Sequence, residues 1–207
     1  MDRNMSSGSG TGFARREFLK GTGAAMAATA LATQEAAAQQ KEAAKSAKIS
    51  RGPTQIKLNV NGETKEITVE PRATLMDALR NELNLTSCRD VCDRANCGAC
   101  TVLIDGKAVY SCTKLAVECD GVKITTAESL HTPANSDPVI TAFCQHDAMQ
   151  CGFCTPGFVM AVRGFLNQHP NATEEDCRKG LGGNLCRCGT YDGVLKAAID
   201  VAKKGGA

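Results

Sequence analysis

The sequence predicts an α+β protein, in which a small sheet-containing region is followed by a helical region. Up to about residue 125, short runs alternate polar and apolar residues with the two-residue period of strands. From about Ser136 onward, apolar residues recur at helical spacing. Eight of the twelve cysteines form two sets of four with different spacing, and each region holds one set.

Length and composition limit the possible function classes. A chain of 207 residues has room for one or two small domains behind a leader. The net charge is +2 with the two signs evenly balanced, so nothing indicates a nucleic-acid partner. Tryptophan is absent and aromatic residues make up 4%, so the core has to rely on aliphatic side chains. Metal ligation can add folding free energy to such a core.

Residues 1–52 are predicted to be an export signal and a linker. Arg15–Lys20 reads RREFLK, and the following stretch, Gly21–Gln34, is uncharged and modestly apolar. This pattern resembles the twin-arginine signal, which exports folded proteins, although Ala14 stands where that signal usually has Ser or Thr. The stretch is too short and too weakly apolar for a stable membrane span, and Ala36–Ala38 offers a cleavage site. We therefore expect a periplasmic protein; the alternative is an alanine-rich helix in a disordered tail.

The sheet region is expected to begin with a hairpin and a helix. Residues 54–60 and 64–69 alternate, and the Asn-Gly pair at 61–62 provides a two-residue turn because both positions tolerate positive φ. Thr74 is followed three residues later by Asp77, which is the arrangement of a helix-capping box.

A second hairpin and a last strand complete this region. Residues 101–104 and 107–110 flank an Asp-Gly turn, and residues 122–125 form a further short strand. The resulting order is strand, strand, helix, cysteine loop, hairpin and strand, which favours a small α+β domain.

The first cysteine set lies mainly in the loop between the predicted helix and the second hairpin. It comprises Cys92, Cys97, Cys100 and Cys112, with the spacing C-x4-C-x2-C-x11-C. Four thiolates complete the ligand shell of one iron–sulfur cluster, and the first three match the plant-type spacing for [2Fe–2S]. Gly98 lacks a Cβ and lets the backbone approach an inorganic sulfide. A structural zinc site is the alternative, although zinc ligands usually come as two close pairs from separate turns.

Four helical segments are expected in the second region, with short joints that favour a small bundle. The first runs from Val139 to Met149, the second covers 158–166, the third begins at the capping residue Thr173, and the last covers 195–201.

The second cysteine set lies at the joints between these helices. It comprises Cys151, Cys154, Cys186 and Cys188, with the spacing C-x2-C and then C-x-C. Side chains at helix ends can converge although their pairs are far apart in sequence, so we expect a second cluster at one end of the bundle. A disulfide framework is the alternative for both sets, but small secreted scaffolds rarely carry such pairs within short loops.

Three motifs carry a resemblance to a known family. CGACTVLIDG begins at Cys97, QCGFCTPG spans 150–157 and GNLCRCGTY spans 183–191. With these motifs, the chain resembles the iron–sulfur subunit of the molybdenum hydroxylases, the xanthine dehydrogenase and aldehyde oxidoreductase family. Its leader makes it most similar to the small subunit of bacterial periplasmic aldehyde oxidoreductases. The resemblance implies a ferredoxin-like β-grasp domain over 53–130 and an all-α four-helix domain over 131–207, each with one [2Fe–2S] cluster.

The resemblance also implies an electron-transfer role. A large subunit holds molybdopterin cytosine dinucleotide and performs hydroxylation, and this chain passes the electrons singly to an FAD subunit or another acceptor. The cluster of the second cysteine set is expected nearer the molybdenum cofactor, where Gln150 and Cys188 match positions that approach the pterin. Aldehydes are the preferred substrate class. Complexes that oxidise purines, N-heterocycles or carbon monoxide, and a free-standing ferredoxin-like carrier, are the alternatives.

The chain departs from the family pattern in the first cysteine loop. The family often has glycine before the first ligand and inside the x4 loop, where this chain has Val91 and residues 93–96. We therefore expect an altered loop shape and an altered cluster potential, since hydrogen bonds to the sulfurs tune both.

The remaining cysteines and the histidines are expected to have structural roles. Four cysteines lie outside the two sets and are predicted to be buried small hydrophobic residues: Cys88, Cys119, Cys144 and Cys177. Ligand exchange by Cys88 is the alternative. His131, His146 and His169 are not expected to be ligands, because two cysteine-only shells are already complete. No group for bond-making chemistry stands out, so the sequence predicts no catalytic residue, and the enzymatic activity belongs to the complex.

Overall fold

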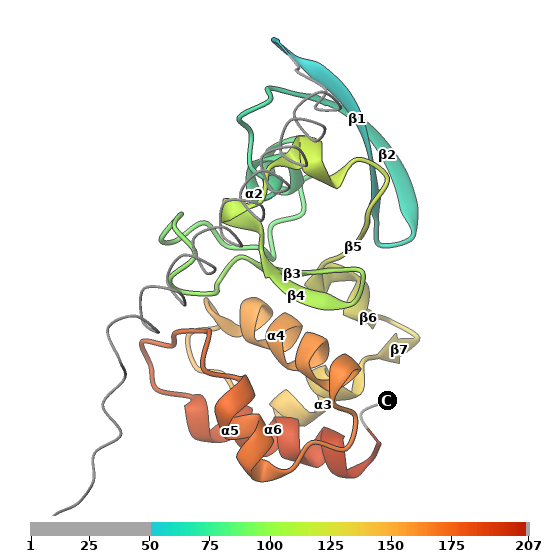
Figure 1. Ribbon diagram of the computed structural model, residues 1–207. Coiled ribbons are helices and arrows are strands. Elements are labelled where there is room, and N and C mark those ends of the chain that lie inside the picture. Colours follow the sequence, from blue (N-terminus) through green and yellow to red (C-terminus); the bar gives the residue numbers. More distant parts are fainter. Residues whose placement is uncertain (1–50, 206–207) are drawn as a thin grey trace, which may run out of the picture. The chain divides into compact units, whose positions relative to one another are not determined.

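The computed structural model describes residues 51–205, all within one compact unit that is drawn in colour in Figure 1. The predicted twin-arginine signal and its cleavage site lie outside the described residues. Among the residues described, no helix is long and apolar enough to cross a membrane.

Five strands form one mixed sheet in the order β2-β1-β5-β3-β4. β1 (Thr54–Val60) and β2 (Glu63–Val69) form the predicted first hairpin, and β3 (Thr101–Ile104) and β4 (Lys107–Tyr110) form the second. β5 (Lys123–Thr125) pairs parallel to β1 and antiparallel to β3, and it thereby joins the two hairpins.

Both hairpins depend on left-handed turn residues. Asn61 and Gly62 have φ of 56° and 86°, and Asp105 and Gly106 have φ of 48° and 79°. Asn, Asp and Gly adopt this conformation at low cost, which is why the sequence already indicates both turns. The two predicted hairpins are confirmed.

The helix predicted from Thr74 is only partly α-helical. α2 (Leu75–Asp77) begins with the expected capping box, in which the Thr74 hydroxyl accepts from the Asp77 N–H and the Asp77 carboxylate accepts from the Thr74 N–H. The chain then continues as a π-helical turn, Ala78–Glu82, because the Leu83 N–H bonds to the Ala78 carbonyl five residues back. The buried side chains of both segments belong to the core cluster of the sheet.

Short elements connect the sheet to the helices. They are three 3₁₀ turns, Ser111–Thr113, Ala116–Cys119 and Ala127–Leu130, and a two-residue hairpin of β6 (His131–Thr132) and β7 (Asn135–Ser136).

The described helical region contains α3 (Pro138–Gln145), α4 (Thr155–Gln168), α5 (Glu174–Gly180) and α6 (Tyr191–Lys203) (Figure 1). α5 starts at the predicted cap, Thr173, with a second capping box. The first helix was expected to reach Met149, and that boundary is wrong. α3 ends at Gln145 because Asp147 adopts a positive φ of 47°, and Met149 lies exposed beyond it.

α4 packs directly against the β3–β4 hairpin, as Figure 1 shows. Two glycines seven residues apart, Gly157 and Gly164, make this close approach possible. A Cβ at Gly164 would lie 2.9 Å from the Ala108 backbone nitrogen, closer than side-chain carbons pack. The helix therefore approaches the hairpin closely, with Gly164 against the side chains of Leu103 and Ala108 and the Ala108 backbone. The predicted boundary between two domains at residue 130 stays a prediction.

Candidate metal centres

The structure gathers the first cysteine set into two pairs of thiols. Cys92 lies beside Cys97, and Cys112 lies beside Cys100. Cys100 and Cys112 are buried, whereas Cys92 and Cys97 are half-buried. Cys112 lies in the 3₁₀ turn that follows β4, so the hairpin returns it to the loop of the other three. All four predicted ligands of the first site therefore lie together.

Backbone N–H groups of the first loop point at two of these sulfurs. The Ala95 N–H donates to Cys112 Sγ at 3.3 Å, and the Asn96 N–H donates to Cys92 Sγ at 3.4 Å. Asp93 and Ala95 reach this geometry with φ of 52° and 54°. Glycine adopts such angles freely and Asp at low cost, so the strain falls mainly on Ala95. The loop thus has no glycine, but Asp93 and Ala95 adopt the left-handed conformation that glycine would favour.

Hydrogen bonds and burial shift the pKa values of the thiols of this set in opposite directions. The backbone N–H groups of Arg94 and Asn96 lower the pKa of Cys92 to about 7. Burial raises the pKa of Cys112 to about 11 and also raises the pKa of Cys97. A metal ligand has to be a thiolate, so occupation of this site releases protons from the buried thiols.

The second cysteine set also forms two pairs. Cys151 lies beside Cys188, and Cys154 lies beside Cys186. Thr190, the N-cap residue of α6, donates to Cys186 Sγ from its hydroxyl at 3.2 Å and from its N–H at 3.5 Å. Burial opposes ionisation of Cys186, but the hydrogen bonds from Thr190 outweigh it and lower the pKa to about 7. Burial and the neighbouring Cys186 raise the pKa of Cys154 to about 12.

The paired arrangement fits a two-iron cluster at each set. Within the described part of the chain, no three His, Cys, Asp or Glu side chains converge as one metal ion requires. In a [2Fe–2S] cluster each iron takes two of the four thiolates, so the ligands have to come as two pairs. The pairs at the first set are Cys92 with Cys97 and Cys100 with Cys112, and the second set is divided in the same way.

The second set opens onto the surface through an apolar cavity of about 450 Å³. Cys151, Cys154 and Cys186 line it together with Cys97 of the first set. Four large apolar side chains of the lining are strongly exposed: Val91, Phe153, Leu185 and Tyr191. We refer to these four residues as the apolar rim. Gln150 and Cys188, the predicted pterin neighbours, are exposed close to it in sequence.

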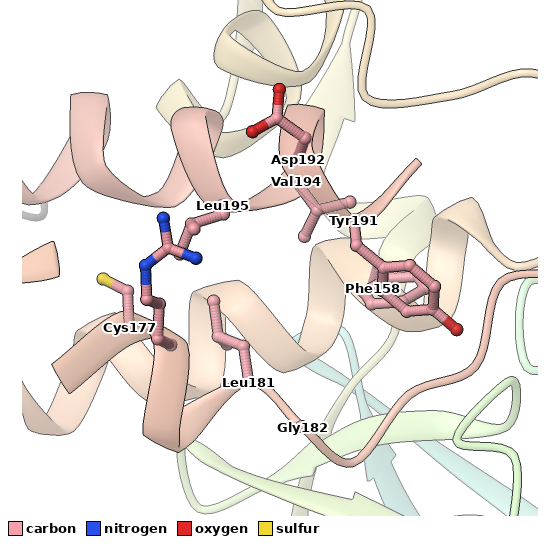
Figure 2. Close-up of a pocket in the computed structure, with 9 residues that line it drawn as sticks. Phe158, Cys177, Leu181, Gly182, Tyr191, Asp192, Val194 and Leu195 are labelled. Atoms are coloured by element: carbon pink, nitrogen blue, oxygen red, sulfur yellow. The ribbon is translucent and has the colours of Figure 1, made fainter. Parts of the chain in front are cut away.

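A second cavity, of about 370 Å³, lies between α5 and α6 (Figure 2). None of the eight predicted ligands lines it. Tyr191 belongs to its wall, with its ring edge-on to Phe158 at 6.0 Å and its hydroxyl accepting a hydrogen bond from the Cys186 N–H at 2.8 Å. Tyr191 therefore helps to hold the backbone of Cys186, a predicted ligand of the second site, in position.

The segment Gly183–Cys186 ties the second site to the first, and sequence reasoning missed this connection. The Asn184 amide donates to the Gly98 carbonyl at 2.8 Å, and the Leu185 N–H donates to the Cys97 carbonyl at 2.9 Å. The Asn184 side chain fills the space that a Cβ on Gly98 would take, and the approach of the Gly98 backbone to a sulfide stays a prediction. The only available signal was the position of Asn184 two residues before a predicted ligand.

The four cysteines outside the two sets, and two of the histidines, make other contacts. Cys88, Cys119 and Cys177 are buried as predicted, but the prediction is wrong for Cys144, which lies exposed on α3. The Cys88 thiol donates to the Leu85 carbonyl at 3.4 Å. His146 pairs with Asp200 at 3.6 Å, and the ring of His169 lies 4.9 Å from that of Phe165.

Comparison with known proteins agrees with this geometry. The family model for the 2Fe-2S iron–sulfur cluster binding domain matches residues 58–122, and the model for the [2Fe-2S] binding domain matches residues 126–199. The small subunit of nicotine 6-hydroxylase from Paenarthrobacter nicotinovorans is 44% identical over 146 residues, which cover 70% of this chain and 88% of that one. The chain belongs to the iron–sulfur subunits of the molybdenum hydroxylase family.

Further members of this family are similar over most of their length. The iron–sulfur-binding subunit of aldehyde oxidoreductase from Escherichia coli is 39% identical over 160 residues, 70% of each chain. The crystal structure of quinoline 2-oxidoreductase from Pseudomonas putida 86 superposes with a TM-score of 0.70 at 35% identity. That superposition covers 76% of this chain and 100% of the matched one. As a member of the family, the chain is an electron-transfer subunit with two [2Fe–2S] domains, one matching each cysteine set.

Proposed function

We propose that this iron–sulfur subunit takes electrons from a large subunit that holds molybdopterin cytosine dinucleotide. It passes them to an FAD subunit or another acceptor during the oxidation of aldehydes to carboxylic acids. The observation that carries this proposal is the apolar rim around the second cysteine set. Val91, Phe153, Leu185 and Tyr191 are 53%, 52%, 52% and 47% exposed. A contiguous exposed apolar surface of this kind marks a protein–protein contact.

The two cysteine sites face different surroundings, which supports a direction for the electrons. The second site opens through the apolar rim, where Cys151 and Cys188 are themselves exposed. Residues 93–96 beside the first site are all exposed and three of them are polar, although Cys97 of this site also lines the apolar cavity. We assign the second site to the hydroxylase subunit and the first site to the acceptor, because polar contacts suit a transient electron-transfer partner.

The chain's own residues supply ligands and hydrogen bonds. We assign the first cluster to Cys92, Cys97, Cys100 and Cys112, and the second to Cys151, Cys154, Cys186 and Cys188. When bound, each [2Fe–2S] cluster takes up and releases one electron. N–H and hydroxyl donors on the sulfurs stabilise negative charge there and so raise the reduction potential.

The remaining parts of the proposal concern the fold and the destination of the protein. The strand order and the four α-helices support a β-grasp domain over 53–130 followed by a four-helix domain over 131–207. Export by the twin-arginine route to the periplasm rests on residues 15–20. Exposed Gln150 and Cys188 are proposed to meet the pterin across the interface.

A second candidate function is the same electron transfer in a complex that oxidises N-heterocycles. It is favoured by the names of two similar proteins, a nicotine 6-hydroxylase subunit and a quinoline oxidoreductase.

The test is purification of the native complex, metal analysis, and assays with aldehydes, nicotine, quinoline and purines. We expect a molybdenum-containing large subunit and turnover of aldehydes. Turnover of N-heterocycles alone would select the second candidate, and a chain that purifies alone would indicate a free-standing carrier.

A pair of matched variants tests the docking surface. Leu185→Asp places a charge on the apolar rim, and we expect the large subunit to be lost on purification while both clusters remain. Leu115→Asp places the same charge on an apolar residue that is 37% exposed and does not line the rim cavity. The assignment of the docking surface fails if both variants keep the large subunit.

A further inference from the structure

A buried amide lies between the two cysteine sites. Asn184 is 4% exposed, and its Nδ2 donates to the Gly98 carbonyl at 2.8 Å and approaches Thr101 Oγ1 at 3.4 Å. Gly98 directly follows the ligand Cys97, and Asn184 precedes the ligand Cys186 by two positions. One side chain therefore connects the loop of the first site to the segment that supplies the second.

The Gly98 peptide is enclosed on several sides. Its carbonyl also accepts from the Thr101 hydroxyl at 2.6 Å and from the Thr101 N–H at 3.2 Å. A Cβ on Gly98 would lie 2.6 Å from Asn184 Cγ, and a Cβ on Gly157 would lie 2.6 Å from the Gly98 oxygen. With so little free space, the position of Asn184 fixes the position of the first loop relative to α4.

Three successive residues, Gly183, Asn184 and Leu185, each form a hydrogen bond to the sheet region. The Gly183 carbonyl accepts from the Tyr110 hydroxyl at 2.7 Å, and the Leu185 N–H donates to the Cys97 carbonyl at 2.9 Å. Asn184 lies between them. The Leu185 bond matters most for electron transfer, because Cys97 and Cys186 are then joined by one hydrogen bond and a short stretch of backbone.

We propose that Asn184 is a positioning residue for electron transfer between the two sites. It holds the Cys97–Leu185 hydrogen bond in place and with it the separation of the two clusters. One electron passes at each step, from the second site to the first, and no covalent bond forms or breaks. Because tunnelling rates fall steeply with separation, a small displacement slows the transfer. This inference rests on the proposed function, in which the hydroxylase subunit is the reductant.

The test compares two asparagines that make the same kind of bond. Asn184→Ala removes the amide between the sites. Asn167→Ala is the matched control, because the Asn167 amide also joins the helical region to a glycine carbonyl, that of Gly106 at 3.2 Å, but it lies on the surface away from the cysteine sites. Both variants are made in the full chain and purified in the complex, and iron and sulfide are counted.

Two measurements follow that require neither substrate nor hydroxylase turnover. The first is the magnetic interaction between the two reduced clusters in the EPR spectrum. The second is the rate at which an electron from a flash-generated reductant redistributes between them. In Asn184→Ala we expect a weaker interaction and a slower redistribution with unchanged iron content, while Asn167→Ala matches the unaltered chain. Failure of the proposed substrate would leave these readouts unaffected, because neither measurement uses substrate.

A milder variant keeps the proposal testable if Asn184→Ala does not assemble both clusters. Tyr110→Phe removes only the hydrogen bond to Gly183 and leaves Asn184 in place. We expect it to change both readouts in the same direction and by less. The proposal is overturned if the variant that assembles both clusters, Asn184→Ala or else Tyr110→Phe, shows the same interaction and rate as Asn167→Ala.

Discussion

Replacing Gly157 by alanine is predicted to destabilise the protein, although the same replacement in an exposed helix interior ordinarily stabilises the folded state. Gly157 lies in the first turns of α4, where an alanine would ordinarily gain about 1 kcal/mol of helix propensity. Here the new Cβ would lie 2.6 Å from the Gly98 oxygen, 3.0 Å from Ala99 Cα and 3.1 Å from the Ala99 oxygen. All three atoms belong to backbone, so no side chain can turn away.

The size of the effect follows from these two opposing contributions. Overpacking in a well-packed region costs about 1–3 kcal/mol. The Gly98 carbonyl also accepts hydrogen bonds from Thr101 and Asn184, so moving it disturbs more than one contact, and the cost should fall in the upper part of this range. The net loss is about 1–2 kcal/mol after the gain in propensity. For a chain of this size that lowers Tm by roughly 2–8 °C.

Thermal unfolding of the cluster-loaded chain, followed by circular dichroism, measures this effect. Gly182→Ala is the matched control, because a Cβ there meets nothing within 4 Å, and its unfolding free energy should stay within about 0.5 kcal/mol of the original. A Gly157→Ala protein that unfolds at or above the temperature of the unaltered chain would refute the argument, because α4 would then not rest on the first cysteine loop.

Three further predictions concern the cysteine loops. Ala95→Gly relieves a left-handed residue with φ of 54° and should stabilise the folded chain by about 1 kcal/mol in denaturant titrations; a destabilised variant would contradict the strain argument. Cys88→Ser should leave iron content unchanged, and a loss of iron would instead indicate ligand exchange. Burial raises the pKa of the Cys88 thiol in the folded state to about 11. The contribution of this thiol to the free energy of unfolding is therefore complete below about pH 9, and about 2–3 kcal/mol of it is lost as the pH rises towards 11. The Cys88→Ser variant should lack this part of the alkaline destabilisation. Rebuilding the clusters in the iron-free protein should release protons in weakly buffered solution at pH 8, because Cys112 and Cys154 have pKa values raised to about 11 and 12; reconstitution without proton release would show that these thiols are not ligands.

Local sequence signals predict the elements that depend on neighbouring residues. The two hairpin turns follow from the Asn-Gly and Asp-Gly pairs, and both capping boxes follow from a threonine three residues before an aspartate, at Thr74 and Thr173. The grouping of the cysteines also follows from spacing, since each set collects its thiols from one loop or from neighbouring helix ends. The structure places the members of each set near one another, and their role as cluster ligands stays a prediction.

Contacts between distant segments could not be predicted in this way. The closeness of Asn184 to Gly98 depends on how α4 rests on the hairpin, and no periodicity or local motif reports that distance. Two local features were also missed because tertiary structure overrides propensity. The π-helical turn after Asp77 and the left-handed Asp147 that ends α3 both occur where the pattern alone favours a continued α-helix.

The contact between Gly98 and Asn184 also sets an order of events during synthesis. The two residues are 86 positions apart, so the ribosome adds the whole of α3, α4 and α5 after the first three cysteines of the first site have been made. A nascent chain therefore carries the four cysteines of the first set while residues 113–183, about a third of the chain, are added, and during that time it lacks the donor that later encloses their loop. The first site can reach its finished form only when the chain is nearly complete. A chain that stops before residue 184 would hold the ligands of the first cluster in a loop that contacts α4 but lacks the Asn184 amide.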